Sequence, residues 1–310
     1  MTSLQQGAED YLALRRSLGF KLKRPCRFIR DFVTWLERSG ESRITIRLAL
    51  EWATQPQHLQ RAEWAARLSA IRGFARYWSG IDTATEVPPD GLLPFRAGRA
   101  TPYLYSNGEI EGLLQAARCM PAQFELQPAT YYCLLGLLAV SGLRISEALK
   151  LERRDIDWTE GLLTIRGTKF GKSRLVPLHP TTKQVLAEYA ARRDRLFPAH
   201  PAAAFFPSKT GTYLDFGQVR RVFYRLSRQI GIRGTLASHG PRLHDLRHRF
   251  AVESLLRWYR AGEDVKQRLP ILSTYLGHSH PTDTYWYLSN TPELMAAAGS
   301  CIEKRWEVQA

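Results

Sequence analysis

A break in the helical pattern divides this chain. Residues 85–102 read "TEVPPDGLLPFRAGRATP", a stretch of prolines, glycines and two arginines with no periodicity, whereas the sequence on both sides is regularly patterned. Such a composition supports neither a helix nor a strand and is typical of a linker. At 310 residues the chain is long enough for two domains that each bury a core. We therefore predict a helical domain over residues 1–80, a linker over 81–102 and a second domain over 103–310.

The first domain is predicted to consist of helices. Three segments end at the glycine signals 19, 40 and 80: "AEDYLALRRSLG", "PCRFIRDFVTWLERSG" and "AEWAARLSAIRGFARYWSG". In the last segment, apolar side chains recur every three or four residues from Trp64 to Trp78, which marks a buried stripe. Arg72 and Arg76 lie on another face of this helix. That face is either solvated or in contact with phosphates.

The second domain is predicted to be mainly helical with one small sheet. Ser106 or Asn107 can cap its first helix, and the apolar run "YYCLLGLLAVSGL" at 131–143 predicts a buried helix over about 129–140. A short helix at 145–151 precedes two strand-like stretches, 163–166 and 175–178, joined by a Gly- and Lys-rich turn. Helical patterns return at 181–196, at 215–230 and through the rest of the chain. The fold class is mainly α with a β-hairpin.

The charge balance narrows the choice of partner. Lysine and arginine number 44 against 29 acidic residues, for a net charge of +15. Both parts are basic, with 16 basic against 10 acidic residues in 1–100. A polyanion such as nucleic acid is therefore the expected ligand. The four cysteines lie far apart without a C-x-x-C pair, which fits a reduced, cytosolic protein, and no apolar run is long enough to span a bilayer.

Several residues that suit phosphate chemistry occur in a characteristic order. Arg144 lies in "SGLRISEALKL", Lys169 in "RGTKFGKSRLVPL", His244 and Arg247 in "HDLRHRF", His278 in "LGH", and Tyr287 nine residues later. Breaking a DNA strand without water or metal needs a side-chain nucleophile, a proton donor for the leaving oxygen and fixed cations for the pentavalent phosphorus. In this order and spacing, residues 103–290 resemble the tyrosine recombinases of the phage-integrase superfamily.

The resemblance implies a role for each of these residues. Arg144 and Arg247 would clamp the scissile phosphate, and Lys169 would protonate the leaving 5′ oxygen. His244 and His278 would donate to the non-bridging oxygens, and Tyr287 would attack to form a 3′-phosphotyrosyl bond. Glu147 would hold the site together. The first domain would be the family's helical, SAM-like core-binding domain.

The same resemblance implies the partners. The ligand would be double-stranded DNA, bound by a dimer on one site and by a tetramer in synapsis, with identical or related recombinase subunits. Neither a metal nor a nucleotide cofactor would be needed, no membrane would be involved, and the protein would act in the bacterial cytoplasm at the nucleoid. A mobile element is the expected biological context. A type IB topoisomerase and a catalytically silent DNA-binding partner subunit are the alternative functions.

Plainer interpretations accompany several of these assignments. Lys172 shares the hairpin turn with Lys169, so either is a candidate acid, and Lys172 and Arg174 are also candidate DNA contacts. Arg144 could instead be a cation at the end of the apolar helix. His244 and His248, four residues apart, could suggest a metal site, although no third ligand is patterned nearby.

The remaining alternatives concern the third motif and the end of the chain. His278 could be an ordinary residue at a helix start. If residues 283–289 are helical, Tyr285 and Tyr287 point about 200° apart, so only one of them faces the phosphate. The family's interval from the Gly-His histidine selects Tyr287, and Tyr285 and Trp286 are then expected to pack the segment onto the domain. A C-terminal helix within 291–310 is expected to pack onto a neighbouring subunit.

Overall fold

The computed structural model describes residues 3–93, 101–167, 173–197, 204–236, 239–278, 280, 282–288 and 292–307, the last seven of them by their backbone only. The chain divides into two compact units, residues 1–100 and 101–310, and each is described by itself. Both are mainly helical, and the second holds a three-stranded sheet. The expected fold class is therefore confirmed. In the described part of the chain, no helix combines the length and apolar character needed to cross a membrane.

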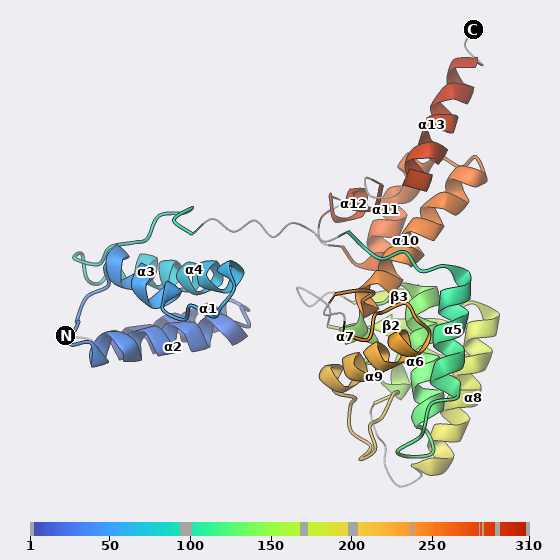
Figure 1. Cartoon of the computed structure of the whole chain (residues 1–310), viewed down its shortest axis with the longest axis horizontal. Coiled ribbons are helices and arrows are strands. Elements are labelled where there is room, and N and C mark those ends of the chain that lie inside the picture. Colours follow the sequence, from blue (N-terminus) through green and yellow to red (C-terminus); the bar gives the residue numbers. More distant parts are fainter. Residues whose placement is uncertain are drawn as a thin grey trace. The chain divides into compact units, whose positions relative to one another are not determined.

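The first unit is built from helices that share one core (Figure 1). Its elements are α1 (Leu4–Ser17), α2 (Lys23–Arg38), α3 (Ile46–Thr54) and α4 (Arg61–Trp78). Each contributes large apolar side chains to the core, among them Leu12, Phe32, Trp52 and Phe74. The sequence patterns predicted three of these helices and missed α3. The signal for α3 is Thr45, whose hydroxyl accepts a hydrogen bond from the Leu48 amide at 3.2 Å and so caps the helix.

Part of the predicted linker belongs to the first unit. Val87 and Leu93 pack against its core. Arg72 holds this segment in place, because its Nε donates to the Pro88 carbonyl at 2.8 Å and its Nη2 to the Pro89 carbonyl at 2.9 Å. A third contact joins Nη1 to the Asp90 carboxylate at 2.8 Å. The predicted linker therefore starts as an ordered strap, and residues 94–100 lie outside the described part.

The second unit contains most of the secondary structure. Its elements are α5 (Asn107–Arg118), α6 (Gln127–Ser141), α7 (Ile145–Ala148), the 3₁₀ turn η1 (Arg153–Asp155), β1 (Ile156–Asp157), β2 (Leu162–Ile165), β3 (Arg174–Pro177), α8 (Pro180–Leu196), α9 (Phe216–Gln229), α10 (Leu243–Arg260), α11 (Val265–Leu276), α12 (Thr282–Leu288) and α13 (Pro292–Glu307). Of the two candidate caps for α5, Ser106 is the one used, in a capping box with Glu109.

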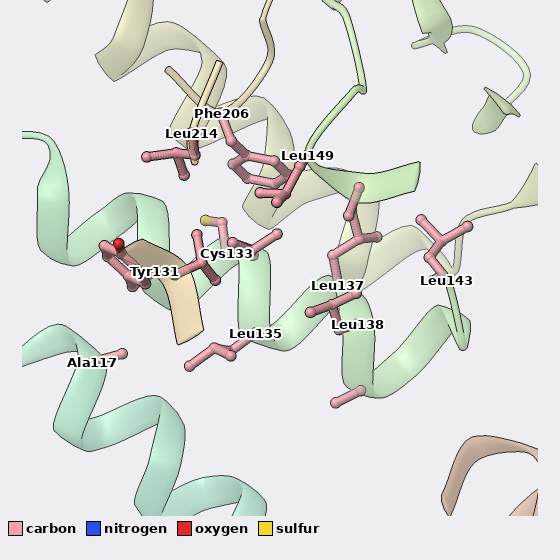
Figure 2. Close-up of a cluster of buried hydrophobic side chains, with 14 of the residues drawn as sticks. Ala117, Tyr131, Cys133, Leu135, Leu137, Leu138, Leu143, Leu149, Phe206 and Leu214 are labelled. Carbon is pink, nitrogen blue, oxygen red and sulfur yellow. The ribbon is translucent and has the colours of Figure 1, made fainter. Parts of the chain in front are cut away.

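Helix α6 forms the centre of the second unit. Most of its circumference is apolar and buried, and the stripe of Ala129, Tyr132, Gly136 and Val140 reaches the surface in part. Figure 2 shows Leu135, Leu137 and Leu138 of this helix among side chains from other elements, including Phe206 and Leu214. The C-terminal end of α6 is therefore held in position by the core of the second unit.

The sheet has the strand order β1-β2-β3, with both pairs antiparallel. Leu163 of β2 pairs with Val176 of β3, and Ile165 pairs with Arg174. The inward-facing Leu163, Ile165 and Val176 are fully buried, which ties the sheet to the α6 core. The predicted hairpin corresponds to β2 and β3, and β1 is an additional strand.

The last four helices surround a smaller core of their own. Leu255 of α10, Leu272 and Leu276 of α11, Tyr287 of α12 and Leu294 of α13 are all buried in it. Figure 1 shows α13 beginning beside α10 and extending past it. The end of α11 and the helix α12 both lie close to the start of α10, where Arg247 binds the Leu276 carbonyl and His248 contacts the Tyr287 ring.

Candidate active site

Arg144 stands at the junction between α6 and α7. Helix α6 ends at Gly142, whose φ of 60° is the left-handed conformation that glycine adopts readily, and Arg144 is the N-cap of α7. Its Nη1 donates to Glu147 at 2.8 Å and its Nη2 to the Gly277 carbonyl at 2.9 Å. The side chain is 29% exposed. The guanidinium is thus fixed from one side and open on the other.

Glu147 binds two arginines at once. Its carboxylate accepts from the Arg144 amide at 3.0 Å and from Arg144 Nη1 at 2.8 Å. It also accepts from Arg174 Nη1 at 3.0 Å and Nη2 at 2.7 Å. Burial raises the pKa of this carboxyl, but the hydrogen bonds and charge of Arg174, followed by those of Arg144, lower it to about 2. Glu147 is therefore ionised at neutral pH and binds both arginines as a carboxylate.

Arg247 is the most deeply buried cation of the site. It is 1% exposed, and it donates from Nη1 to the Gly142 carbonyl at 2.8 Å and from Nη2 to the Leu276 carbonyl at 2.6 Å. Burial and the charge of Arg144 lower its pKa to about 10, while Tyr287 and Glu147 act in the opposite direction. Arg247 stays protonated at neutral pH and joins the end of α6 to the end of α11.

Three arginines converge on the C-terminal end of α11. Arg174 donates from Nε to the carbonyl of Tyr275 at 2.7 Å, Arg247 binds the next carbonyl, that of Leu276, and Arg144 binds the one after it, that of Gly277. A helix C-terminus carries partial negative charge and unpaired carbonyls, so it attracts cations. The alternative role of Arg144, a cation at the end of α6, is taken by Arg247. Arg247 binds the carbonyl of Gly142, the C-cap of α6, whereas Arg144 binds the carbonyl of Gly277, the C-cap of α11.

His278 follows this turn directly. It lies between α11 and α12 and belongs to neither helix. Its Nδ1 is 2.7 Å from the Thr284 hydroxyl, and its ring stacks on that of Tyr287 with centroids 5.9 Å apart. Burial, followed by the charges of Arg247 and Arg144, lowers the pKa of His278 to about 4. The imidazole is therefore neutral at pH 7 and acts there as a hydrogen-bonding group.

The two tyrosines of α12 occupy opposite environments. Tyr287 is 4% exposed, whereas Tyr285 is 55% exposed. The predicted divergence of their directions is confirmed, but the expectation that Tyr285 packs onto the domain is wrong. Trp286 does pack, with its ring centroid 5.0 Å from that of His248. Burial raises the pKa of the Tyr287 phenol, while the charges of Arg247 and Arg144 lower it in part.

Helix α10 contributes both histidines near its start. The His244 side chain reaches the surface, yet surrounding protein atoms, followed by the charge of Arg247, lower its pKa. His248 is 7% exposed and lies between the rings of His244 and Tyr287, with centroids 4.8 and 5.3 Å away. Among the described residues no cluster of three or more histidine, cysteine or acidic side chains could hold a metal ion. In the sequence, only the position of His248 directly after Arg247 indicates that its ring lies against that of Tyr287.

The remaining predicted site residues are the two lysines of the hairpin turn and three candidate DNA-binding arginines. Lys169 and Lys172 lie outside the described residues. Arg174, expected on the DNA, is only 10% exposed at its side chain and is bound to Glu147 and the Tyr275 carbonyl. Arg72 is occupied by the strap described above, whereas Arg76 is exposed.

The sequence reasoning also missed a basic surface. Four arginines of α9 are exposed along a helix whose opposite face is buried: Arg220, Arg221, Arg225 and Arg228. The nine residues 220–228 contain these four arginines and no acidic residue, which is visible in the sequence.

Comparison with known proteins places the chain in a family. The phage integrase family model matches residues 105–293. A putative integrase/recombinase, y4rB of Sinorhizobium fredii, is 52% identical over 99% of both chains. The related y4rE of the same organism is 35% identical, over 95% of this chain and 94% of its own. The tyrosine recombinase XerC of Chlamydia caviae is 31% identical over 71% of this chain and 65% of its own.

Solved structures share the fold. The XerH recombinase in a post-cleavage complex with its difH substrate has a TM-score of 0.65 at 19% identity, covering 98% of this chain and 86% of its own. The Tn1549 transposon integrase with transposon right end DNA also has a TM-score of 0.65, at 16% identity, with coverages of 98% and 99%.

The fold and the arginine, histidine and tyrosine cluster define a DNA strand-transfer enzyme of the tyrosine recombinase class. The chain belongs to the phage integrase family, and its activity is that of a tyrosine site-specific recombinase.

Proposed function

We propose that this recombinase cuts and rejoins DNA through a covalent bond between Tyr287 and a 3′ phosphate. One observation carries the proposal. The Tyr287 side chain lies in the same cluster as Arg144, Arg247 and His278, which come from three separate segments of the chain. The cluster thus combines a phenol that can act as a nucleophile with two cations that can bind a phosphate.

The chemistry follows from this arrangement. The scissile phosphate binds to Arg144 and Arg247, whose planar forks of N–H donors match phosphate oxygens and neutralise the charge of the pentavalent transition state. The Tyr287 phenol loses its proton to water, and its oxygen forms a bond to phosphorus as the bond to the 5′ oxygen breaks. Lys169 is the assigned donor of the proton that the 5′ oxygen takes up, and His278 and His244 donate to the non-bridging oxygens. Attack by a 5′ hydroxyl of another strand reverses the step and rejoins the DNA.

The nucleophile acts on the DNA bound by its own subunit. Arg247 and Arg144 lie close enough to Tyr287 to affect the pKa of the phenol within a single chain. A mixture of Tyr287→Phe and Arg144→Met subunits tests this assignment. If each active site is formed by Arg144 and Tyr287 of the same subunit, the mixture should stay inactive, since no subunit then holds both residues. Recovered cleavage would mean that the tyrosine is donated between subunits.

The partner is double-stranded DNA, bound by a dimer that assembles into a tetramer of identical or related subunits. The XerH and Tn1549 integrase complexes hold DNA, and a lambda integrase tetramer has been solved on a Holliday junction. The exposed arginines of α9 and Arg76 of α4 are the proposed phosphate contacts. Integration and excision of a mobile element in the bacterial nucleoid is the proposed role, because the relatives are bacterial integrases and one structural neighbour is a transposon integrase.

The outer part of α13 is proposed to join a neighbouring subunit. Leu294 in its first turn is 1% exposed in the core of its own chain, whereas the adjacent Met295 is 62% exposed. Deletion of residues 291–310 should reduce synaptic tetramers more than DNA binding, as measured by native gel electrophoresis of protein–DNA complexes. Unchanged tetramer formation would refute this role.

A suicide substrate tests the assignment of Tyr287 as the nucleophile. A nick near the cleavage site lets the short fragment with the free 5′ hydroxyl diffuse away, so the DNA cannot be rejoined. The wild-type enzyme should accumulate a covalent protein–DNA adduct, and Tyr287→Phe should form none. Tyr285→Phe is the matched control, because it makes the same change on the same helix at the exposed position. An adduct that survives in Tyr287→Phe, or that disappears only in Tyr285→Phe, would show that the wrong tyrosine has been assigned.

A further inference from the structure

The carboxylate of Glu147 is shared between two cations with different surroundings. Arg144 is 29% exposed and Arg174 is 10% exposed, while Glu147 itself is 7% exposed at its side chain. Arg174 makes the two-pronged contact, with one Nη on each carboxylate oxygen, and Arg144 makes a single side-chain contact. Arg174 is thus the stronger partner of Glu147, because a bidentate arginine–carboxylate pair is the more favourable geometry.

All three nitrogens of the Arg174 guanidinium are engaged in this position. Its Nη atoms bind Glu147 and its Nε donates to the Tyr275 carbonyl at 2.7 Å. It is also tightly enclosed, since a Cβ added at Gly277 would lie 2.9 Å from Arg174 Nη1. To turn outward to a DNA phosphate, the side chain would have to break all three of these contacts.

Arg144 has the complementary properties. A guanidinium has five N–H donors, and the contacts of Arg144 with Glu147 and with the Gly277 carbonyl use two of its Nη hydrogens. Three donors remain that no described residue engages. Because Glu147 is neutralised by Arg174, the positive charge of Arg144 is not cancelled.

We propose that Arg174 is a positioning residue of the active site: it neutralises Glu147 and thereby keeps the charge and the free donors of Arg144 available to the scissile phosphate. This inference rests on the proposed function, in which Arg144 binds that phosphate. Arg174 touches neither DNA nor the reacting atoms and acts through Glu147. It replaces the DNA contact predicted from the sequence.

Removal of Arg174 should therefore impair catalysis through Arg144. In Arg174→Met, Glu147 would be left with Arg144 as its only cationic partner, and the carboxylate would draw the Arg144 guanidinium into a neutral pair. We expect adduct formation on the suicide substrate to slow by about tenfold to a hundredfold, somewhat less than the loss of a direct transition-state donor. When Arg174→Met is added to Arg144→Met, the salt dependence of DNA affinity should stay unchanged, whereas loss of a phosphate contact made by Arg174 itself would reduce the slope by about 0.9.

The decisive experiment is the double variant Glu147→Gln with Arg174→Met. It removes the buried negative and positive charges together and leaves an amide to hold Arg144. If Arg174 acts by neutralising Glu147, the double variant should form adduct at least about fivefold faster than Arg174→Met alone. Arg192→Met is the matched control, since it breaks an exposed pair with Glu125. Exposed pairs contribute little, so its rate should equal that of the wild type.

The outcomes separate the two proposals. A double variant that is as slow as Arg174→Met or slower would overturn the neutralising role. A salt slope that falls when Arg174→Met is added to Arg144→Met would also overturn it, because Arg174 would then contact a phosphate itself. Thermal unfolding of each variant identifies those that lose rate merely because they unfold, and cleavage is then compared below the lowest melting temperature. Failure of the wild-type enzyme to form any Tyr287 adduct would instead refute the proposed function.

Discussion

The loss of the Arg247 guanidinium should weaken the fold as well as the chemistry. Arg247→Met keeps an apolar stem of similar length but leaves the buried carbonyls of Gly142 and Leu276 without their donor. A hydrogen bond from a charged group contributes about 1.5–3 kcal/mol, so the two bonds together contribute about 3–6 kcal/mol. The variant also avoids burying a cation, which offsets part of this loss. We expect a net destabilisation of about 2–4 kcal/mol.

This destabilisation should be local to the helices that Arg247 joins. Hydrogen exchange followed by mass spectrometry measures it directly, because the opening free energy of peptides from 265–278 should fall while that of α2 in the first unit stays constant. Arg257→Met, an exposed position on the same helix, is the control and should change neither. Suicide-substrate cleavage should fall by about a hundred- to a thousandfold. Unchanged protection of 265–278 in a correctly folded Arg247→Met would refute the idea that this residue connects α6 to α11.

Three further changes probe the same region. Gly277→Ala places a Cβ 2.9 Å from Arg174 Nη1 at a φ of 68°, so we expect a loss of about 1–3 kcal/mol in urea unfolding, and a loss below 0.5 kcal/mol would contradict it. Burial lowers the pKa of His248 to about 4 in the folded protein, against about 6.5 in the unfolded chain. Between these two values the unfolded chain binds more protons, so the free energy of unfolding decreases as the pH is lowered from about 6.5 to about 4. His248→Phe should therefore flatten the dependence of unfolding free energy on pH between 6.5 and 4.5 by up to about 1.4 kcal/mol per pH unit, and an unchanged slope would exclude this role. Tyr105→Phe removes a 3.0 Å hydrogen bond to the Arg242 carbonyl at the start of α10, and calorimetry should show a loss of about 1 kcal/mol, with an unaltered melting temperature counting against it.

Local signals in the sequence were sufficient for most of the elements. Glycines end α1 and α2, the fully apolar run forms α6, and the alternation of Leu163 and Ile165 marks β2. These signals act within a few residues, so they can be recognised without tertiary information. Short elements such as β1 and α3 were missed because few residues carry their pattern.

Two of the arginines show why side-chain roles are harder to predict than helices. Arg72 and Arg174 have no local feature that distinguishes them from exposed cations. Arg72 binds backbone carbonyls 16 and 17 residues away, and Arg174 binds a carbonyl 101 residues away. A partner at that separation is visible only after folding.

The sequence alone determined the class of chemistry, because the order Arg144, Arg247, His278 and Tyr287 at these intervals is specific enough to indicate a tyrosine recombinase, and helical geometry separated Tyr287 from Tyr285. Only the tertiary structure decided how the cations are held. The carbonyls at the end of α11 and the carboxylate of Glu147 select which guanidinium is buried and which stays open. The physical reason is that charge and hydrogen bonding act through space over a few ångströms, whereas the chain brings those groups together from segments more than a hundred residues apart.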